Sequence, residues 1–269
     1  MLNGKRIAVV LPAFNAAITL AQTVAEIDRS VVDDVLMVDD ASTDGTVEIA
    51  QKLGLAPIVH DHTGGYGSNQ KTCYAAALAL GADVVVMLHP DYQYSPRLVV
   101  PMAGMIAYGD YDMVLGSRIL SQNAVDGGMP RYKYVANRSL TLFQNLVVGY
   151  KLSEYHTGLR AFSKELLNAL HLERNSDDFV FDNQVIVQGL AAGARIGELS
   201  CPARYFDAAS SINFRRSVRY GLGVLRTSVQ YRVNKSGLKR YPYLEVARPL
   251  WADDGAIDAV PPAGNTHSL

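Results

Sequence analysis

The chain has 269 residues, of which 49% are hydrophobic and 19% charged, a composition typical of a soluble globular protein with one large α/β domain. Its net charge of -1 argues against a general nucleic-acid binder, and its two cysteines are too few for a disulfide framework or a zinc cluster, so we expect a cytoplasmic protein. We find no pattern of a secretory leader, and no apolar run reaches the roughly 18 residues of a membrane span.

Short apolar runs alternate with helical patterns along the chain, which predicts a mostly parallel, Rossmann-like α/β sheet flanked by helices. The run between Gly81 and Pro90 has the uninterrupted hydrophobicity of a strand that is buried on both faces. The sequence predicts strands at 6–11, 35–38, 57–60, 84–89, 112–115 and 195–199, and helices at 16–28, 46–53, 75–80, 96–108, 134–150, 164–170 and 179–192.

The first two predicted strands end in residues that suit ligand binding. Pro12 closes the first strand, and Asn15 is expected to cap the helix that follows. Asp39 and Asp40 end the second strand, where carboxylates can accept hydrogen bonds from ribose hydroxyls or a base edge, as in dinucleotide-binding folds. Helix capping by either aspartate is the structural alternative.

A glycine-rich stretch, 62–71, follows the third strand and leads into the helix at 75–80. A glycine such as Gly67 lets the backbone approach a ligand closely, and the N-terminus of the following helix, near Lys71, would favour a phosphate. The spacing matches neither a Walker loop nor the dinucleotide fingerprint, so neither motif is assigned.

Three side chains with nitrogen or oxygen atoms that could contact a ligand alternate after the central strand, namely His89, Asp91 and Gln93. Because Pro90 disfavours a helix at His89, we expect an extended segment in which the three side chains project to one side. They would then lie at the carboxyl ends of the strands, where open α/β sheets bind ligands. The alternative is a turn capped by Asp91 beside a packed histidine.

Further polar residues stand at the ends of later elements. Arg118 follows the strand at 112–115, and the loop at 120–132 is long enough to be a substrate lid. Asp182, near the start of the helix at 179–192, is a candidate N-cap for that helix.

The segment 208–244 contains eight arginines and lysines and no acidic residue. Hydrophobic residues recur within it at spacings of three and four, namely Phe214, Val218, Leu222, Leu225 and Val229. A basic amphipathic helix of this kind is typical of a surface that binds anionic lipid head groups, although an ordinary docked helix with a solvated basic face has the same pattern. We expect 245–269 to be a disordered tail.

The ordered series of short motifs resembles the family 2 glycosyltransferases, and among them the branch of dolichyl-phosphate and polyprenyl-phosphate sugar synthases. The resemblance covers about 6–206. Its motifs are Leu11-Pro12-Ala-Phe14-Asn15, Val38-Asp39-Asp40, His89-Pro-Asp91-Tyr-Gln93, Gly116-Ser117-Arg118 and Thr157-Gly158-Leu-Arg160. It implies a GT-A domain over 1–207 that uses a UDP- or GDP-sugar donor and a divalent metal, Mn²⁺ or Mg²⁺, and inverts the anomeric carbon.

The resemblance also implies roles for the matched positions. It places the nucleoside among Pro12, Phe14, Asn15, Asp39 and Asp40. It places the metal on His89, Asp91 and Gln93. Arg118 and Arg160 match arginines near the diphosphate and the acceptor phosphate, and Arg131 is a third candidate. The implied acceptor is a polyprenyl phosphate, with the enzyme held peripherally at the inner face of the membrane.

Two positions depart from the family pattern. Ala16 stands where the family usually has glutamate, and His89 replaces the first aspartate of the metal motif, which favours manganese over magnesium. Two alternatives therefore stay open: a transferase to a soluble sugar or alcohol with Asp182 as base, and a degenerate nucleotide-binding module without turnover. Nucleotidyl transfer is disfavoured because no glycine-rich basic loop follows the first strand. A homo-oligomer also stays open.

Overall fold

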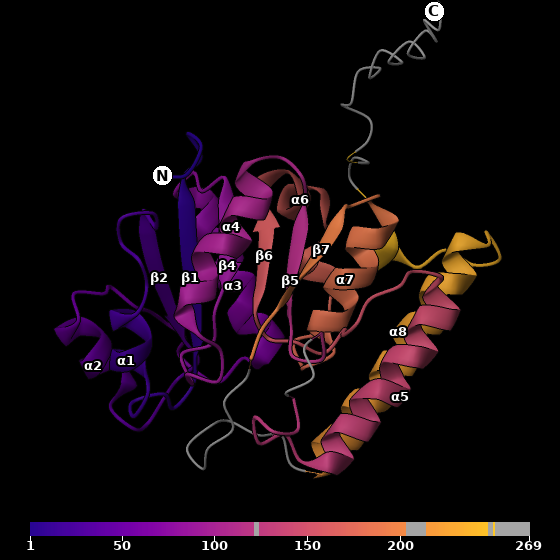
Figure 1. Ribbon diagram of the computed structural model, residues 1–269, viewed down its shortest axis with the longest axis horizontal. Helices are drawn as coiled ribbons and strands as arrows, with labels where there is room; N and C mark the ends of the chain where they lie inside the picture. Colours follow the sequence, from indigo (N-terminus) through magenta and orange to yellow (C-terminus); the bar gives the residue numbers. More distant parts are fainter. Residues whose placement is uncertain (121–123, 203–213, 247–249, 251–269) are drawn as a thin grey trace, which may run out of the picture.

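The computed structural model of the protein describes residues 1–120, 124–202, 214–246 and 250. The central sheet has seven strands. Figure 1 shows helices on both faces of the sheet and a pair of long helices at one side. The strands are β1 (Ile7–Ala13), β2 (Asp34–Asp39), β3 (Ile58–Val59), β4 (Val84–Met87), β5 (Met113–Ser117), β6 (Arg160–Ser163) and β7 (Ile196–Ser200). The predicted α/β class is confirmed.

The helices are α1 (Leu20–Ala25), α2 (Thr46–Lys52), α3 (Tyr66–Ala79), α4 (Val99–Ala107), α5 (Arg131–Val148), α6 (Lys164–Ala169), α7 (Phe181–Ala191) and α8 (Phe214–Lys235). Each α-helix of the described residues corresponds to a predicted one, and α8 lies within the basic amphipathic segment at 208–244. Short 3-10 turns lie at Pro96–Leu98, Leu172–Arg174 and Pro242–Leu244.

The strand order is β3-β2-β1-β4-β6-β5-β7. β1 pairs in parallel with β2 and β4, so the carboxyl ends of these three strands lie at one edge of the sheet. β6 runs antiparallel between β4 and β5, and Arg160 at its start is in register with Met87 and Leu115 near the ends of those strands. β6 was not among the predicted strands, because four residues that begin with an arginine carry little strand signal.

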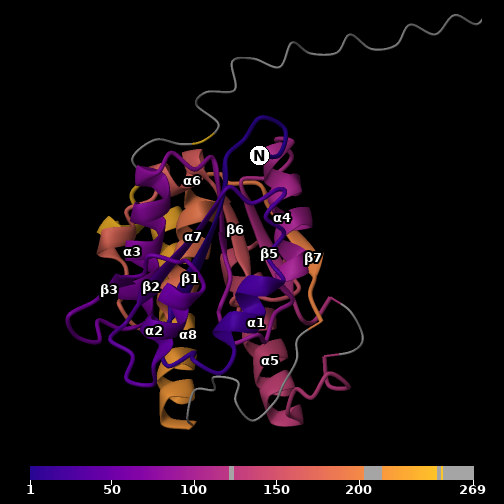
Figure 2. The same ribbon diagram turned by 90° about the vertical axis from the view of Figure 1, so that its left-hand side faces the viewer.

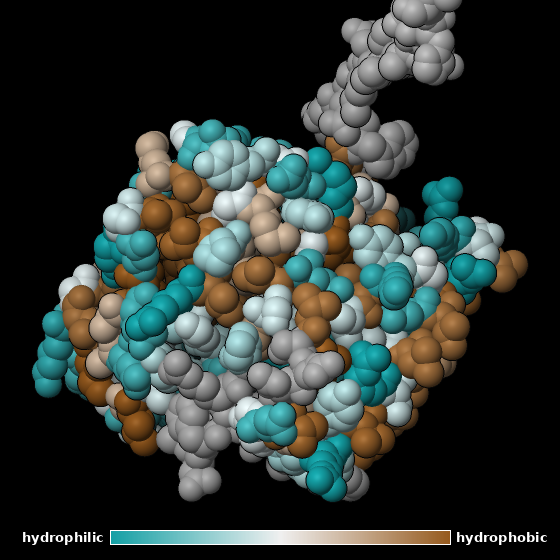
Figure 3. Space-filling view, in the orientation of Figure 1, coloured by the Kyte–Doolittle hydropathy of each residue, from teal (hydrophilic) through white to brown (hydrophobic). Residues whose placement is uncertain are grey.

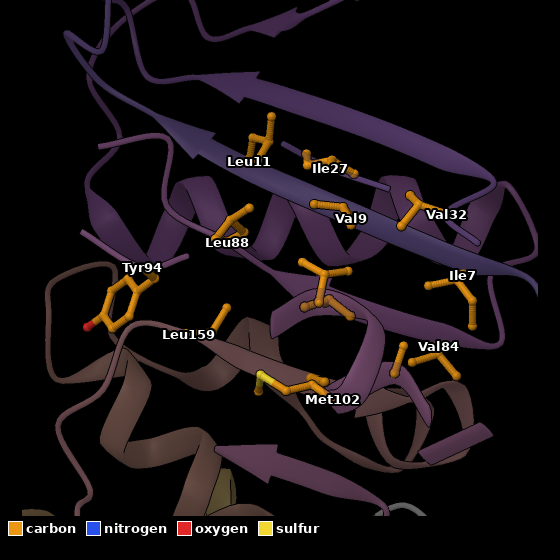
Figure 4. Close-up of a cluster of buried hydrophobic side chains, with 14 of the residues drawn as sticks. Ile7, Val9, Leu11, Ile27, Val32, Val84, Leu88, Tyr94, Met102 and Leu159 are labelled. Atoms are coloured by element: carbon orange, nitrogen blue, oxygen red, sulfur yellow. The ribbon is translucent and has the colours of Figure 1, made fainter. Parts of the chain in front are cut away.

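Alternate residues of β1 face the two hydrophobic cores. Ile7, Val9 and Leu11 pack with Met102 of α4 on one face (Figure 4), while Ala8 and Val10 point to the opposite face, which α3, α6 and α7 cover. Figure 2 shows α3 and α4 on opposite sides of the sheet. A strand buried on both faces lacks the usual alternation of polar residues, which is why these strands read as continuous apolar runs.

The starts of two helices, α1 and α3, differ most from the prediction. α1 begins at Leu20 and not at residue 16, because Asn15 adopts a left-handed backbone with φ of 52° and does not cap the helix. α3 begins at Tyr66, so the second half of the glycine-rich stretch is helix and not an open loop. Gly67 is required by close packing there, since a Cβ at this position would lie 2.3 Å from the carbonyl oxygen of Ser176.

α5 and α8 lie side by side and carry hydrophobic residues on their outer faces. The exposed side chains are Tyr132, Val135, Leu142 and Leu146 on α5 and Val218, Leu222 and Val229 on α8. Brown side chains accordingly line the lower right edge of Figure 3, where Figure 1 places these helices. Val218, Leu222 and Val229 of the predicted apolar stripe therefore face outward, while Leu225 is half-buried. The buried residues of the helix are Val224, Thr227, Ser228 and Tyr231.

Within the described ranges, no helix is long and apolar enough to cross a membrane. α8 occupies most of the expected extension at 208–244 and packs against α5 and α7. The expected disordered tail at 245–269 lies almost wholly outside the described residues. The division into a domain at 1–207 and an extension stays a prediction.

Asn69 of α3 connects the carboxyl ends of β1 and β2. Its side-chain nitrogen donates to the carbonyl oxygens of Ala13 and Val38, at 3.1 Å each, and the residue is buried. We expect Asn69→Ala to lower the free energy of unfolding by about 1–3 kcal/mol, since two buried hydrogen bonds are lost. Urea denaturation would measure it, with exposed Asn168→Ala of α6 as the matched control. Equal stability of the two variants would contradict the role of Asn69.

Candidate functional site

Asp39 and Asp40 lie at the carboxyl end of β2, and their carboxylates accept hydrogen bonds from different partners. Asp40 accepts hydrogen bonds from the backbone N–H groups of Gly64 and Gly65, at 2.8 and 3.0 Å, and lies 2.9 Å from Nδ1 of His60. Its two oxygens therefore hold the glycine-rich segment in place. Asp39 accepts from the backbone N–H of Ser42 through Oδ2. Neither aspartate caps a helix, because α2 begins after Gly45.

The second oxygen of Asp39 has no hydrogen-bond partner. Asp39 is fully buried, and Oδ1 is one of three buried side-chain atoms without a partner among the described residues. A buried carboxylate oxygen without a donor is costly, on the order of 1–3 kcal/mol. A ligand N–H or O–H that reached this oxygen would remove that cost, so Asp39 is the site residue with the clearest unmet hydrogen-bonding need.

The predicted first motif lies next to this carboxylate. Pro12 is buried within β1, while Phe14 just beyond the strand is 55% exposed and presents an aromatic face to solvent. Asn15 is exposed, and its side-chain oxygen accepts from the backbone N–H of Thr43, which connects the ends of β1 and β2. An exposed ring beside two strand ends suits stacking on a base.

The segment after β4 does not continue as an extended strand. Pro90 and Asp91 form a turn, and Tyr92 has a left-handed φ of 58°. Oδ1 of Asp91 accepts from the backbone N–H of Gln93 at 3.1 Å, which stabilises the turn. The expected simple alternation of His89, Asp91 and Gln93 along an extended chain is therefore wrong, and these side chains are arranged by the turn instead.

Asp182 lies in a network of buried polar side chains and is not an N-cap, since it is the second residue of α7. Its Oδ1 accepts from Nε2 of Gln70 at 3.0 Å, and its Oδ2 accepts from the hydroxyl of Tyr66 at 2.7 Å. Arg160 is 1% exposed, and its Nη2 lies 3.4 Å from Oδ2 of Asp182. Both carboxylate oxygens are thus engaged within the protein.

His89 joins this network through Tyr66. Nε2 of His89 lies 3.0 Å from the Tyr66 hydroxyl, and the two rings are stacked with centroids 5.4 Å apart. Burial, together with the neighbouring charge of Asp182, raises the pKa of Tyr66 well above its usual value, so the phenol keeps its proton at neutral pH. Tyr66 and Gln70 were not predicted as site residues, although both lie in the glycine-rich stretch that the sequence marked.

Arg118 is paired inside the protein. Its Nε donates to Oε1 of Glu154 at 2.9 Å, its backbone N–H donates to Oε2 at 2.7 Å, and Glu154 is fully buried. The charge and hydrogen bonds of Arg118 outweigh desolvation and lower the pKa of Glu154. Sequence reasoning missed Glu154, because a single acidic residue outside any motif carries no signal.

The remaining predicted residues are placed as follows. The backbone N–H of Gly67 donates to the carbonyl oxygen of Asp177 at 2.7 Å, and Nζ of Lys71 donates to Asn175 and Asp177. Both groups therefore hold the segment that precedes α7 and do not open toward a phosphate. Arg131 is exposed at the first turn of α5. The loop at 120–132 is described only in part, so its role as a lid stays a prediction.

The donor set after β4 can be compared with what a divalent metal requires. Among the described residues, no group of three or more His, Cys, Asp or Glu side chains could hold a metal by itself. His89, Asp91 and Gln93 would supply one nitrogen and two oxygens, a mixed set that suits manganese. Such a set fits a metal that is shared with the phosphate oxygens of a bound nucleotide, as is usual for metals in phosphate chemistry.

Comparisons with known proteins point to a family. Residues 8–170, more than half of the chain, match the family model described as glycosyl transferase family 2. A protein of Methanocaldococcus jannaschii without an assigned function is 28% identical over 210 residues, which cover 78% of this chain and 86% of that protein. The UDP-N-acetylglucosamine–dolichyl-phosphate N-acetylglucosaminyltransferase of Methanococcus voltae is 26% identical over 220 residues, which cover 76% and 87% of the two chains.

Solved structures show the same fold. Glucosyl-3-phosphoglycerate synthase of Mycobacterium tuberculosis, crystallised with Mn²⁺, UDP-glucose and phosphoglyceric acid, superposes with a TM-score of 0.66 at 19% identity. The superposition covers 85% of this chain and 80% of the synthase. The predicted GT-A architecture is thereby confirmed.

The side chain of His156 should make the stability of the protein depend on pH. Its Nδ1 lies 2.7 Å from the hydroxyl of Tyr220 on α8, its Nε2 is buried without a partner, and burial lowers its pKa to about 4. An unfolded histidine titrates near pH 6.5. Between these values only the unfolded chain takes up the proton, so stability must fall as the pH falls.

We expect the free energy of unfolding to drop by about 2 kcal/mol between pH 7 and pH 5 because of His156. His156→Gln should flatten this dependence, whereas His62→Gln, at an exposed position, should leave it unchanged. Denaturant titrations across the pH range would measure both. An unchanged slope in His156→Gln would show that the histidine is not buried in its neutral form.

Proposed function

The chain belongs to glycosyl transferase family 2, and from this premise we propose that it transfers a hexose from a UDP- or GDP-sugar to a polyprenyl phosphate, with inversion of the anomeric carbon. The observation that carries the choice of acceptor is the engagement of both Asp182 oxygens within the protein. An alcohol acceptor needs a general base, whereas the oxygen of a phosphate monoester is already ionised near pH 7. A site whose candidate base is occupied favours the phosphate.

The donor's nucleoside would bind at the ends of β1 and β2. The unpartnered Oδ1 of Asp39 would accept a hydrogen bond from the base or the ribose, and the exposed ring of Phe14 would stack on the base. Asp40 would contribute to nucleoside binding only indirectly, because its oxygens accept hydrogen bonds from the backbone N–H groups of Gly64 and Gly65.

The donor's diphosphate would lie over the turn after β4. A divalent metal held there by His89, Asp91 and Gln93 would neutralise charge on the leaving diphosphate. The acceptor phosphate oxygen attacks the anomeric carbon on the side opposite the leaving group. The bond from that carbon to the diphosphate breaks, and a polyprenyl-phosphate sugar and a nucleoside diphosphate are formed. The relative from Methanococcus voltae, whose name specifies a dolichyl-phosphate acceptor, supports this assignment.

A pocket between α8 and the segment before α7 would suit the acceptor's phosphate. Its volume is about 220 Å³, and Arg216, Arg219 and Tyr220 line it together with Asp178 and Phe179. The Phe179 ring lies 4.8 Å from that of Tyr66, which places the pocket next to the network around Asp182. Two guanidinium groups against one carboxylate leave net positive charge for a phosphate.

The outer faces of α5 and α8 would hold the enzyme at the membrane that contains a lipid acceptor. The two helices contain nine arginines and lysines and no acidic residue, and these charges flank the exposed hydrophobic side chains. A two-fold contact between copies of this face would bring like charges together, whereas an anionic bilayer complements them. The first turns of both helices lie on the same side of the molecule as the carboxyl ends of β1 and β4 (Figure 1).

Asp91 tests the metal-dependent reaction. We expect Asp91→Ala to reduce transfer of radiolabelled sugar into the lipid fraction by about 100-fold or more, because the leaving diphosphate loses charge stabilisation. Asp110→Ala, an exposed aspartate after α4, is the matched control. Full, metal-independent activity of Asp91→Ala would contradict the proposal. If the native chain bound UDP- or GDP-sugars in a thermal-shift assay but released no nucleotide, it would be a binding module.

Vesicle sedimentation tests the membrane assignment. The native chain should bind vesicles with anionic lipids at low salt and be released as salt rises, because each basic residue near such a surface contributes about 1 kcal/mol. A triple variant with Glu at Arg215, Arg226 and Arg232 should stay in the supernatant. A matched variant with Glu at Lys5, Arg29 and Lys52, exposed cations outside the two helices, should still bind. Equal recovery of all three in the supernatant would refute membrane binding, and a salt-resistant dimer would assign the face to a second copy.

A further inference from the structure

His89 is clamped along one edge of its ring. The Tyr66 hydroxyl lies 3.0 Å from Nε2, and the Tyr66 ring stacks on the imidazole. Gly158 packs against the same edge, since a Cβ there would lie 2.6 Å from Cδ2 and 2.9 Å from Nε2. The opposite vertex of the ring is Nδ1. Among the described residues, the hydrogen bond at Nε2 is the only one that the ring makes.

The Tyr66 hydroxyl donates its proton in a hydrogen bond to Asp182. The hydroxyl lies 2.7 Å from Oδ2 of Asp182, which also pairs with the buried guanidinium of Arg160. Both oxygens of Asp182 face hydrogen-bond donors, namely Tyr66, Gln70 and Arg160, so the carboxylate accepts in each of these contacts. Tyr66 must therefore donate to Asp182, and its oxygen can only accept from His89. The 3.0 Å contact then requires the proton of neutral His89 to lie on Nε2.

The consequence is a defined tautomer. A neutral imidazole that carries its proton on Nε2 has an unshared electron pair on Nδ1, and a histidine binds a metal through such a nitrogen. Ligating histidines usually donate their other ring N–H to a neighbouring oxygen, which fixes both tautomer and orientation. The family resemblance would suggest an aspartate at position 89. An aspartate needs no neighbour to select a tautomer, because both of its oxygens can bind a metal.

We propose that Tyr66 is a positioning residue that selects the Nε2–H tautomer of His89 and thereby presents Nδ1 to the divalent metal of the donor complex. Tyr66 is held for this task by Asp182 and Arg160, and it does not itself touch the metal. The proposal rests on the metal-dependent reaction proposed above, but the tautomer exists in the metal-free protein and can be observed there.

Nitrogen NMR of the ¹⁵N-histidine-labelled, metal-free chain tests the tautomer directly. The chain has six histidines, and the His89 signals are those missing from His89→Ala. In the native chain we expect Nε2 protonated and Nδ1 unprotonated. In Tyr66→Phe both nitrogens should shift toward the average of two exchanging tautomers. Tyr155→Phe, which removes another tyrosine hydroxyl bonded to the carbonyl oxygen of Tyr150, is the matched control and should leave His89 unchanged.

A Mn²⁺ titration in the presence of UDP tests the consequence for the metal. We expect Tyr66→Phe to bind Mn²⁺ about 10- to 100-fold more weakly, the usual effect of losing a partner of a ligating histidine. In a His89→Ala background the same change should have no further effect, because there is no imidazole left to orient. Amide spectra of each variant would establish that it is folded.

Three outcomes would overturn the proposal: Nδ1 protonated in the native chain, a His89 spectrum unchanged by Tyr66→Phe, or an equal loss of Mn²⁺ affinity on Tyr66→Phe with and without His89. If the native chain bound no Mn²⁺, the metal-dependent reaction and the ligand role of His89 would both fail. The nitrogen spectra would still decide whether Tyr66 sets the tautomer, so the two failures are distinguishable.

Discussion

The buried ion pair between Arg160 and Asp182 is the interaction on which the rest of the site depends. A guanidinium with 1% exposure cannot stay charged in the interior unless nearby groups replace its hydration. Carbonyl oxygens of Thr157 and Asp182 accept from Nε and Nη1 at 2.9 and 2.6 Å, and the Asp182 carboxylate supplies the opposite charge. Because Asp182 also accepts from Tyr66 and Gln70, one pair connects β6, α7 and α3. The same connection reaches His89 at the end of β4.

A second buried pair, Arg118 with Glu154, has a comparable effect at the end of β5. The two arginines that the family resemblance places near phosphates are therefore both matched by carboxylates inside the protein. In the proposed reaction the charge of the diphosphate falls mainly to the metal at the turn after β4. The proposed acceptor phosphate then relies on other cations, and Arg216 and Arg219 of α8 line a pocket that includes Phe179, whose ring lies next to that of Tyr66.

The sequence was sufficient to predict the parallel strands and the helices that follow them, because buried parallel strands read as apolar runs that polar residues interrupt sharply. It missed the antiparallel strand β6. It was not sufficient for the short-range geometry. The left-handed backbone of Tyr92 turns the metal motif, and left-handed residues other than glycine are too rare to expect from pattern alone. The partners of Arg118 and Arg160 are brought together by the fold, so residues such as Glu154 have no local signature.

The sequence was also not sufficient to predict that hydrophobic residues of α5 and α8 face outward. Their periodicity indicates helices, but periodicity cannot say which face is buried when polar residues such as Asn137, Thr141 and Gln144 fill the inner side of α5. The buried side of α5 is therefore largely polar, and exposed hydrophobic residues lie on the outer faces of both helices. In the proposed function an anionic bilayer covers these exposed residues, because the charged residues of α5 and α8 are all basic.

A double-mutant cycle on Arg160 and Asp182, read as the free energy of unfolding, tests most directly whether this pair holds the site together. Arg160→Met and Asp182→Asn should each cost about 3–5 kcal/mol, because each leaves the other member buried without its partner. The double variant should lose much less than the sum, with a coupling of about 2 kcal/mol or more. Strictly additive losses would contradict the account, since the two residues would then contribute independently and the pair could not organise Tyr66 and His89.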